Sequence, residues 1–426
     1  MMGLLTISAI LILYSTLSKP LDRRGVTSAM AFTAVGLAVG GSALGLLDVD
    51  LDSAAAELVT EVALALLLFT DAARIDLSAL RRQIAWPRRL LLMGLPLTML
   101  AGAGAGMLVF PGMAIATAFL LSTMLCSTDA ALGQRVVTDP AVPDRVRQAL
   151  DVESGLNDGL AVPFFLVAVD LSLAELTGGV TWAVVQNTAE QIGWGLLAGV
   201  AAGVLGGVLF RQAASRGWME GQWRQILPLA VALLAFAGAD TLGGSGFIAA
   251  FVGGMAFGRA ARDHGASLTH FTEETGDLLA AVTWIGFGAV ALGEAIPLVT
   301  WQIVLYALLS LTIVRMLPVA VALLVRHGAR PPTVAFIGWF GPRGLASIVF
   351  ALMALESEVP EAETLLTTVV VTVAFSVIAH GLTSVPLVTA YQRWYGTHAA
   401  AHPKAAEAVP AAMPRQRQRL MQRDPA

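Results

Sequence analysis

The sequence predicts an all-α polytopic membrane protein whose helices form inverted repeats. Hydrophobic residues make up 56% of the 426 residues and charged residues only 13%, whereas a soluble domain carries about 25% charged residues. The apolar residues gather in about thirteen stretches, most of them close to the ~20 residues that a helix needs to cross a bilayer. Basic loops alternate with acidic or neutral loops between these stretches, which is typical of a chain that repeatedly crosses a membrane.

The apolar stretches define the expected transmembrane helices. The first run, Met1 to Leu17, lacks a basic leading region and a clear small-residue cleavage site, so we expect a retained helix rather than a signal peptide. The single cysteine, Cys126, excludes an intramolecular disulfide and a multi-cysteine metal site. The expected helices occupy roughly 2–18, 26–47, 54–72, 89–110, 112–137, 145–170, 185–210, 225–240, 244–259, 272–294, 299–325, 332–354 and 362–391.

Lysine and arginine are confined to alternate loops. The loops between them are acidic or neutral, as in the segments 48–52 and 356–363. Cytoplasmic loops carry the Lys/Arg excess, so we expect the N-terminus outside, the C-terminus in the cytoplasm and an odd number of crossings. Only two of the 26 basic residues, Arg315 and Arg343, lie inside apolar stretches. Their position predicts charge pairing within the membrane.

The domain organisation is simple. Residues 1–395 are expected to form one transmembrane domain, and residues 396–426, rich in Ala, Pro, Gln and Arg, a short disordered cytoplasmic tail. The sequence shows no dinucleotide-binding domain, and we expect no cofactor, no nucleotide and no nucleic acid as a partner.

Two apolar stretches are interrupted by polar residues, Gly or Pro. The fifth is broken at Ser127-Thr128-Asp129 and the twelfth at Gly341-Pro342-Arg343-Gly344, where proline removes a backbone donor. Broken helices in corresponding positions of inverted repeats are typical of transporter binding sites. The broken ends carry partial charges of opposite sign, which Asp129 and Arg343 are placed to balance. The alternative is that both breaks are kinks that allow close helix packing.

The sixth stretch carries four polar residues on adjacent faces. Residues four apart share a face of a helix, which places Ser154 beside Asp158 and Glu153 beside Asn157. Asp158 and Ser154 supply the hard oxygen ligands that an alkali cation prefers. Glu153 and Asn157 are expected to support the site.

The remaining ligands come from the first break. Asp129 and an unwound carbonyl near Thr128 are candidates to complete the shell around a cation such as Na⁺. Glu153 needs a basic partner because an unpaired buried charge is costly, and either Arg343 or Arg315 fits from sequence alone.

One carboxylate is enough to couple two fluxes. Asp158 can bind a proton or a cation but not both, so competition for it predicts antiport. A helix-stabilising hydrogen bond is the alternative for Asp158, and a helix cap for Asp129. Glu61 is a candidate for the access route, although an interfacial acid explains it equally well. A hydrogen-bonded structural role is expected for His380.

These motifs resemble those of a known family. The segments 127–129, 153–159 and 341–345, with the segment Leu66 to Arg82, resemble the NhaP-type monovalent cation/proton antiporters of the sodium/proton exchanger family. The resemblance runs from about residue 5 to residue 390. One departure is Ala130-Ala131, where the family commonly has Pro-Val.

The resemblance implies a homodimer and a mobile core. It implies core helices at about 89–170 and 299–391, and dimerisation or scaffold helices at about 2–72 and 185–294. It also implies two groups of site residues. The ion would bind Asp158, Asp129, Ser154 and the Thr128 main chain, whereas Glu153, Asn157 and Arg343 would form a structural network with Arg315 in the core.

The resulting hypothesis is electroneutral exchange of Na⁺ or Li⁺ for H⁺ by alternating access, serving pH homeostasis in a bacterial-type cytoplasmic membrane. The Asn157-Asp158 pair is associated with one-for-one exchange in the resembling family. A K⁺/H⁺ antiporter of the same fold is the first alternative. A passive cation channel would need an open polar path. An intramembrane aspartyl protease using Asp129 and Asp158 is the alternative from another class, but it assigns no role to the buried arginines.

Overall fold

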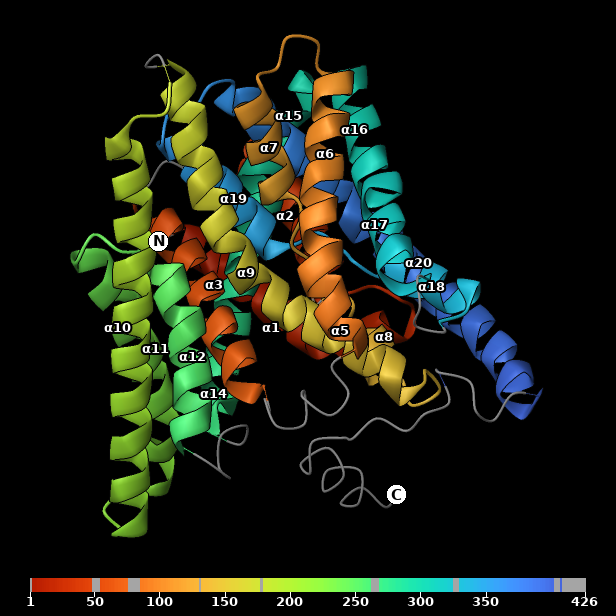
Figure 1. Cartoon of the computed structure of the whole chain (residues 1–426). Coiled ribbons are helices and arrows are strands. Elements are labelled where there is room, and N and C mark those ends of the chain that lie inside the picture. The colour runs from red at the N-terminus through yellow and green to blue at the C-terminus, as the bar shows by residue number, and fades with distance from the viewer. Residues whose placement is uncertain are drawn as a thin grey trace.

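The computed structural model describes residues 2–47, 54–75, 85–129, 132–176, 179–261, 268–324, 329–401 and 407. Within these ranges the regular elements are helices, apart from one isolated bridge between Gly40 and Leu47. The expectation of an all-α fold is therefore confirmed (Figure 1). The elements are α1 (Met2–Arg23), α2 (Ser28–Val39), α3 (Ala54–Arg74), α5 (Ala85–Arg89), η1 (Leu90–Gly94), α6 (Leu95–Val109), α7 (Ile115–Met124), α8 (Gln134–Thr138), α9 (Asp144–Leu176), α10 (Trp182–Ser215), α11 (Gly221–Thr241), α12 (Gly246–Ala261), α14 (His270–Gly286), η2 (Phe287–Leu292), α15 (Gly293–Ala295), η3 (Ile296–Leu298), α16 (Trp301–Leu311), α17 (Ile313–Leu324), α18 (Pro331–Trp339), α19 (Leu345–Glu356) and α20 (Ala362–Ala401).

Each apolar stretch identified in the sequence contains a described helix. Seven helical segments are long and apolar enough to cross a membrane by length and composition, and they begin at Met2, Ala85, Asp144, Trp182, His270, Trp301 and Ala362. The other stretches hold shorter helices, helices divided by a break, or helices that carry more charge. The number of crossings therefore stays a prediction.

The structure corrects the start of the predicted disordered tail. Helix α20 continues to Ala401, past residue 396, where the sequence placed the first residue of that tail. The added residues are rich in alanine, the best helix former, and the Trp394 and His398 rings stack with centroids 4.9 Å apart. Of the residues beyond 401, only Glu407 is described. The acidic residues 48–52, Ala130-Ala131 and several loop arginines also lie outside the described residues.

Helices α3, α10, α11, α12 and α14 pack against one another on one side of the molecule. Close approach of α10 and α12 depends on small residues. A Cβ atom on Gly199 would lie 2.6 Å from the Ala249 carbonyl oxygen, and Gly203 similarly abuts Gly253. Such contacts drive helix association in lipid, where no hydrophobic force acts between helices.

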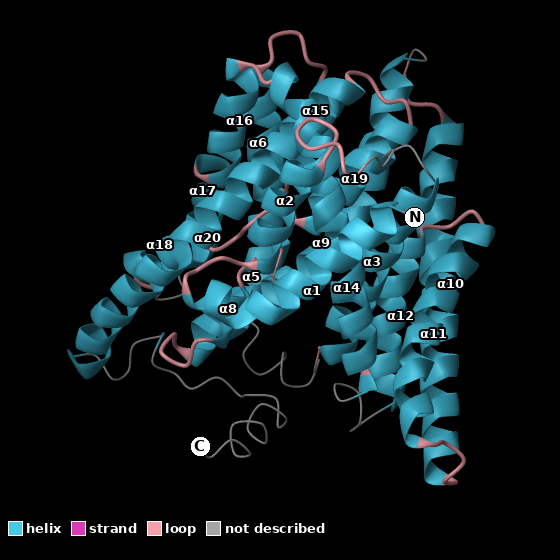
Figure 2. Ribbon diagram, turned by 180° about the vertical axis from the view of Figure 1, so that it is seen from behind, coloured by secondary structure: helices cyan, strands magenta, loops and turns pink. Residues whose placement is uncertain are grey.

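Helices α6, α7, α16, α17, α18, α19 and α20 form a second group. Figures 1 and 2 place this group on the opposite side from α10 to α14, with α9 crossing between them. Helices α9 and α19 both contact α3, and the rings of Phe165 and Phe350 stack between α9 and α19 at 4.7 Å. Glu153, Ser154, Asn157 and Asp158, which were singled out in the sequence, lie on α9 in the seam between the two groups of helices.

Helix α1 is the least enclosed of the long helices. Ile10 is its one buried residue, while Leu4, Leu5 and Ile12 are each more than 60% exposed. A contiguous exposed apolar face on a membrane protein faces lipid or another subunit.

Candidate functional site

The two predicted breaks are present, and their extended segments cross. Helix α7 ends at Met124 and the chain is non-helical through Asp129. Helix α18 ends at Trp339, and α19 begins only at Leu345. The two segments meet where the Asp129 amide donates to the Pro342 carbonyl over 2.8 Å. The backbone thus forms an unwound crossing inside the bundle.

Each break is balanced by a charged residue from the other. The Arg343 side chain donates from Nη1 to the carbonyls of Cys126 and Ser127, over 2.9 and 3.0 Å. These carbonyls follow the C-terminal end of α7, where the helix dipole is negative. In return, the Leu345 amide at the start of α19 donates to Asp129 Oδ2 over 3.2 Å. Arg343 and Asp129 thus each contact the broken end of the other segment, as the predicted balance of charges requires, and Asp129 accepts the first amide of α19 in the manner of a cap.

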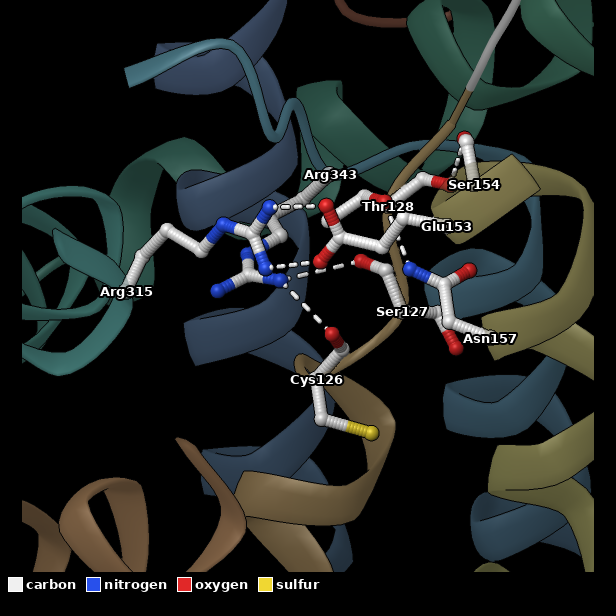
Figure 3. Close-up of polar contacts among 8 residues, drawn as sticks. All are labelled: Cys126, Ser127, Thr128, Glu153, Ser154, Asn157, Arg315 and Arg343. Carbon is white, nitrogen blue, oxygen red and sulfur yellow. Dashed lines mark hydrogen bonds and ion pairs between the residues drawn. The ribbon is translucent and has the colours of Figure 1, made fainter. Parts of the chain in front are cut away.

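A buried ion pair lies beside this crossing. Arg315 on α17 donates from Nη1 and Nη2 to the two carboxylate oxygens of Glu153 on α9, over 2.5 and 2.8 Å. The side chains are only 3% and 4% exposed. Figure 3 shows the Arg343 guanidinium next to that of Arg315. The sequence left the partner of Glu153 open, and the structure identifies Arg315.

Helix α9 holds the first break through two further contacts. Ser154 Oγ donates to the Thr128 carbonyl, and Asn157 Nδ2 donates to the Thr128 hydroxyl over 2.5 Å. Both contacts are drawn in Figure 3. Asn157 therefore supports the break as expected, whereas the Ser154 hydroxyl and the Thr128 carbonyl satisfy each other in this form of the protein.

Asp158 differs from the other acids at the crossing. Its Oδ1 atom is buried and makes no hydrogen bond with any residue that the structure describes. Ser127 lies beside it, and the charges of Asp129 and Asp71 act on it. The residue as a whole is only partly buried, but a carboxylate oxygen that loses water without gaining a partner is unfavourable when ionised.

Glu61 lies away from these residues. It lines a small hollow between α3 and α19 together with Glu57, Thr60 and Glu356. Within the described ranges, no group of three or more His, Cys, Asp or Glu side chains is placed to hold a metal ion.

The sequence-based reasoning missed Asp71 as a site residue. It lies on α3, and a Cβ atom on Gly155 would be only 3.5 Å from Asp71 Cβ. Its carboxylate therefore faces α9 between Asp151 and Asp158. An acid at the end of the apolar run Leu64 to Thr70 was the available signal, but its direction depends on how α3 packs on α9.

Comparisons with known proteins identify relatives that are named as Na⁺/H⁺ antiporters and others that are named as K⁺/H⁺ antiporters. The chain is 26% identical to the Na⁺/H⁺ antiporter of Schizosaccharomyces pombe over 273 residues, covering 60% of this chain and 57% of that protein. It is 27% identical to the K⁺/H⁺ antiporter NhaP2 of Shewanella oneidensis, covering 84% of this chain and 61% of that protein. The chain thus spans about three fifths of the length of these relatives.

The fold is that of a solved transporter, and a family model spans most of the chain. The sodium proton antiporter MjNhaP1 of Methanocaldococcus jannaschii matches with a TM-score of 0.71 and 20% identity, covering 89% of this chain and 99% of that one. The family model "Sodium/hydrogen exchanger, transmembrane" matches residues 6–390. This assignment argues against the intramembrane protease alternative. The chain belongs to the sodium/hydrogen exchanger family.

Proposed function

We propose that this protein is a monovalent cation/proton antiporter in which Asp158 binds either the cation or the proton. The observation that carries the proposal is the buried Asp158 Oδ1, which has no hydrogen-bond partner among the described residues. Because the ionised carboxylate is unfavourable there without a ligand, the empty form is disfavoured. Proton and cation then compete for one group, which couples the two fluxes.

Asp129 and Asp158 have different parts in this mechanism. The Asp129 carboxylate accepts the Leu345 amide at the start of α19, and a helix N-terminus stabilises a negative charge. Asp129 is therefore placed to attract the cation. Asp158 lacks such a donor at Oδ1 and is the acid that exchanges.

The charges at the crossing support electroneutral exchange. Arg315 and Glu153 cancel each other, while Arg343 balances one of the two aspartates. Among the charged residues of the two breaks and α9 at the crossing, one negative charge remains, and one monovalent cation or one proton would balance it; Asp71 of α3 lies beside this group and is not counted in it. Asn157 bonds to Thr128 and adds no titrating group.

Sodium is the proposed cation, with lithium as a second substrate. The ligands would be Asp158, Asp129, the Ser154 hydroxyl and the Thr128 carbonyl. The bond between Ser154 and Thr128 would open as both turn to the ion. Potassium is the alternative, since relatives named as K⁺/H⁺ antiporters match the chain.

We propose alternating access between a scaffold and a core. The scaffold comprises residues 2–72 and 185–294, and the core residues 89–170 and 299–391. Their separate packing, with α9 and α19 at the seam, supports this division. Glu61 would lie on the outer access route and Asp71 on the inner one.

We further propose a homodimer in a bacterial-type cytoplasmic membrane with thirteen crossings, as the sequence predicts. Two features support it. The exposed apolar face of α1 offers a surface for a second copy. The basic turn between α10 and α11, which contains Arg216, and the neutral turn between α6 and α7 lie at opposite ends of the bundle (Figure 1). Basic and neutral loops on opposite sides are what the predicted crossings require.

The test is cation-driven proton movement in proteoliposomes. A pH gradient is imposed, Na⁺, Li⁺ or K⁺ is added, and the internal pH is followed. We expect the gradient to collapse with the parent protein and to persist with Asp158→Asn. Asp170→Asn is the matched control, because Asp170 lies on the same helix and bonds Thr188 away from the crossing. Exchange that continues in Asp158→Asn would contradict the proposal. So would a folded parent protein in which none of the three cations triggers exchange.

A further inference from the structure

The end of α18 is fastened to α20 by two side chains. The Trp339 carbonyl ends α18 and accepts the Gly341 amide over 2.8 Å. His380 Nε2 lies 2.8 Å from this carbonyl oxygen, and His380 is only 2% exposed. The Trp339 indole also donates to Thr383 Oγ1 over 2.9 Å. The residue that precedes the second break is thus bound to α20 from both its backbone and its side chain.

The same helix also holds the middle of the break. Ser376, one turn before His380, accepts the Arg343 amide at its hydroxyl over 2.7 Å. The Ser376 hydroxyl lies 3.2 Å from His380 Nδ1. One continuous helix therefore fixes the break at Trp339 and again at Arg343, and the segment between them contains Pro342, which binds the Asp129 amide.

Both ring nitrogens of His380 have partners on neighbouring backbone. A carbonyl oxygen only accepts, so Nε2 carries the hydrogen that is donated to Trp339. Nδ1 lies 2.8 Å from the Ser376 carbonyl oxygen and 3.2 Å from the Ser376 hydroxyl. The ring therefore links the end of α18 to the turn of α20 that holds the Arg343 amide.

We propose that His380 is a positioning residue for the cation site, which rests on the cation/proton exchange proposed above. The His380 ring holds the end of α18 in the register that brings Pro342 to the Asp129 amide and Leu345 to the Asp129 carboxylate. Without this contact the end of α18 adopts other positions, and only a fraction of molecules has the crossing assembled. Apparent affinity falls by that fraction, while a saturating cation restores the register.

The test compares three variants at His380 in proteoliposomes, with proton flux measured over a range of Na⁺ and K⁺ concentrations. His380→Ala removes both contacts. Its KM is expected to rise about fivefold, a typical effect of losing one buried hydrogen bond while the Gly341 amide still donates to the Trp339 carbonyl, with the maximal rate kept within about twofold. His380→Gln retains an amide donor at the position of Nε2 and is expected to restore the KM. His380→Asn places its amide at the position of Nδ1, cannot reach Trp339, and is expected to behave like His380→Ala.

His270→Ala is the matched control. His270 is exposed and lies beside Glu274 on α14, so its replacement is expected to leave the KM unchanged. Thermal unfolding of each purified variant reports folding separately. If His380→Ala is not recovered folded, the contrast between His380→Gln and His380→Asn carries the test.

The outcomes distinguish the two proposals. Wild-type flux with an unchanged KM in His380→Ala, even with lowered thermal stability, would overturn the positioning role alone. Equal KM values in His380→Gln and His380→Asn would also overturn it. No cation-driven flux in the folded wild-type protein would overturn the proposed function itself.

Discussion

The ion pair between Arg315 and Glu153 predicts an unequal response to the loss of either partner. Both side chains are almost completely buried and joined by two hydrogen bonds of 2.5 and 2.8 Å. Removing one partner of such a pair costs about 3–5 kcal/mol, because the remaining charge stays buried without compensation. The structure further indicates which removal costs more.

The neighbouring Arg343 determines which of the two losses costs more stability. It is completely buried, is repelled by Arg315 and is attracted by Glu153. Arg315→Met leaves Glu153 near Arg343, so we expect a loss near the lower end, about 3 kcal/mol. Glu153→Leu leaves Arg315 buried without its carboxylate and next to Arg343, which repels it, so we expect a loss near the upper end, about 5 kcal/mol.

The measurement is the free energy of unfolding in mixed micelles as the fraction of denaturing detergent rises, followed by tryptophan fluorescence. The double variant closes a thermodynamic cycle. Replacing both charges by apolar residues of similar volume is often neutral, so the double variant should lose less than Glu153→Leu alone. Single losses below about 1 kcal/mol, or a double loss equal to the sum, would refute the assignment of a coupled buried pair.

Three further outcomes follow from the packing. Gly344→Ala should abolish exchange in folded protein, because its Cβ would overlap the Asp129 carboxylate; wild-type flux would contradict this crossing geometry. Asp71→Asn should raise the cation KM several-fold without changing the maximal rate, and more so at low ionic strength, where charge attraction is less screened; a change in maximal rate alone would be inconsistent with an access role. Gly199→Leu should lower the yield of monodisperse protein, because its side chain would meet the Ala249 carbonyl at 2.6 Å; an unchanged thermal unfolding temperature would argue against tight packing of α10 on α12.

The breaks and their charges were predictable from the sequence because the signals are local. Charged residues inside an apolar run are costly in lipid, so Asp129, Asp158 and Arg343 can be recognised as candidates without knowing how the chain folds. Proline and glycine in the twelfth stretch likewise predict the non-helical segment between α18 and α19. The helix period alone places Ser154 beside Asp158.

The tail boundary shows where local reasoning is weakest. The composition beyond residue 396 predicted disorder, whereas α20 extends to Ala401. Alanine is common in low-complexity tails but is also the best helix former, so composition alone does not separate the two. Trp394 and His398 are one helical turn apart, and their rings stack. Composition does not reveal this contact.

By itself the sequence determined the membrane class, the positions of the breaks and most of the acids and arginines that meet there. Only the tertiary structure decided the partners. Arg315 rather than Arg343 pairs with Glu153, Asp71 from α3 faces α9, and His380 fastens the end of α18. These contacts join residues far apart in the chain, and their geometry is fixed by how helices pack rather than by any pattern within one helix.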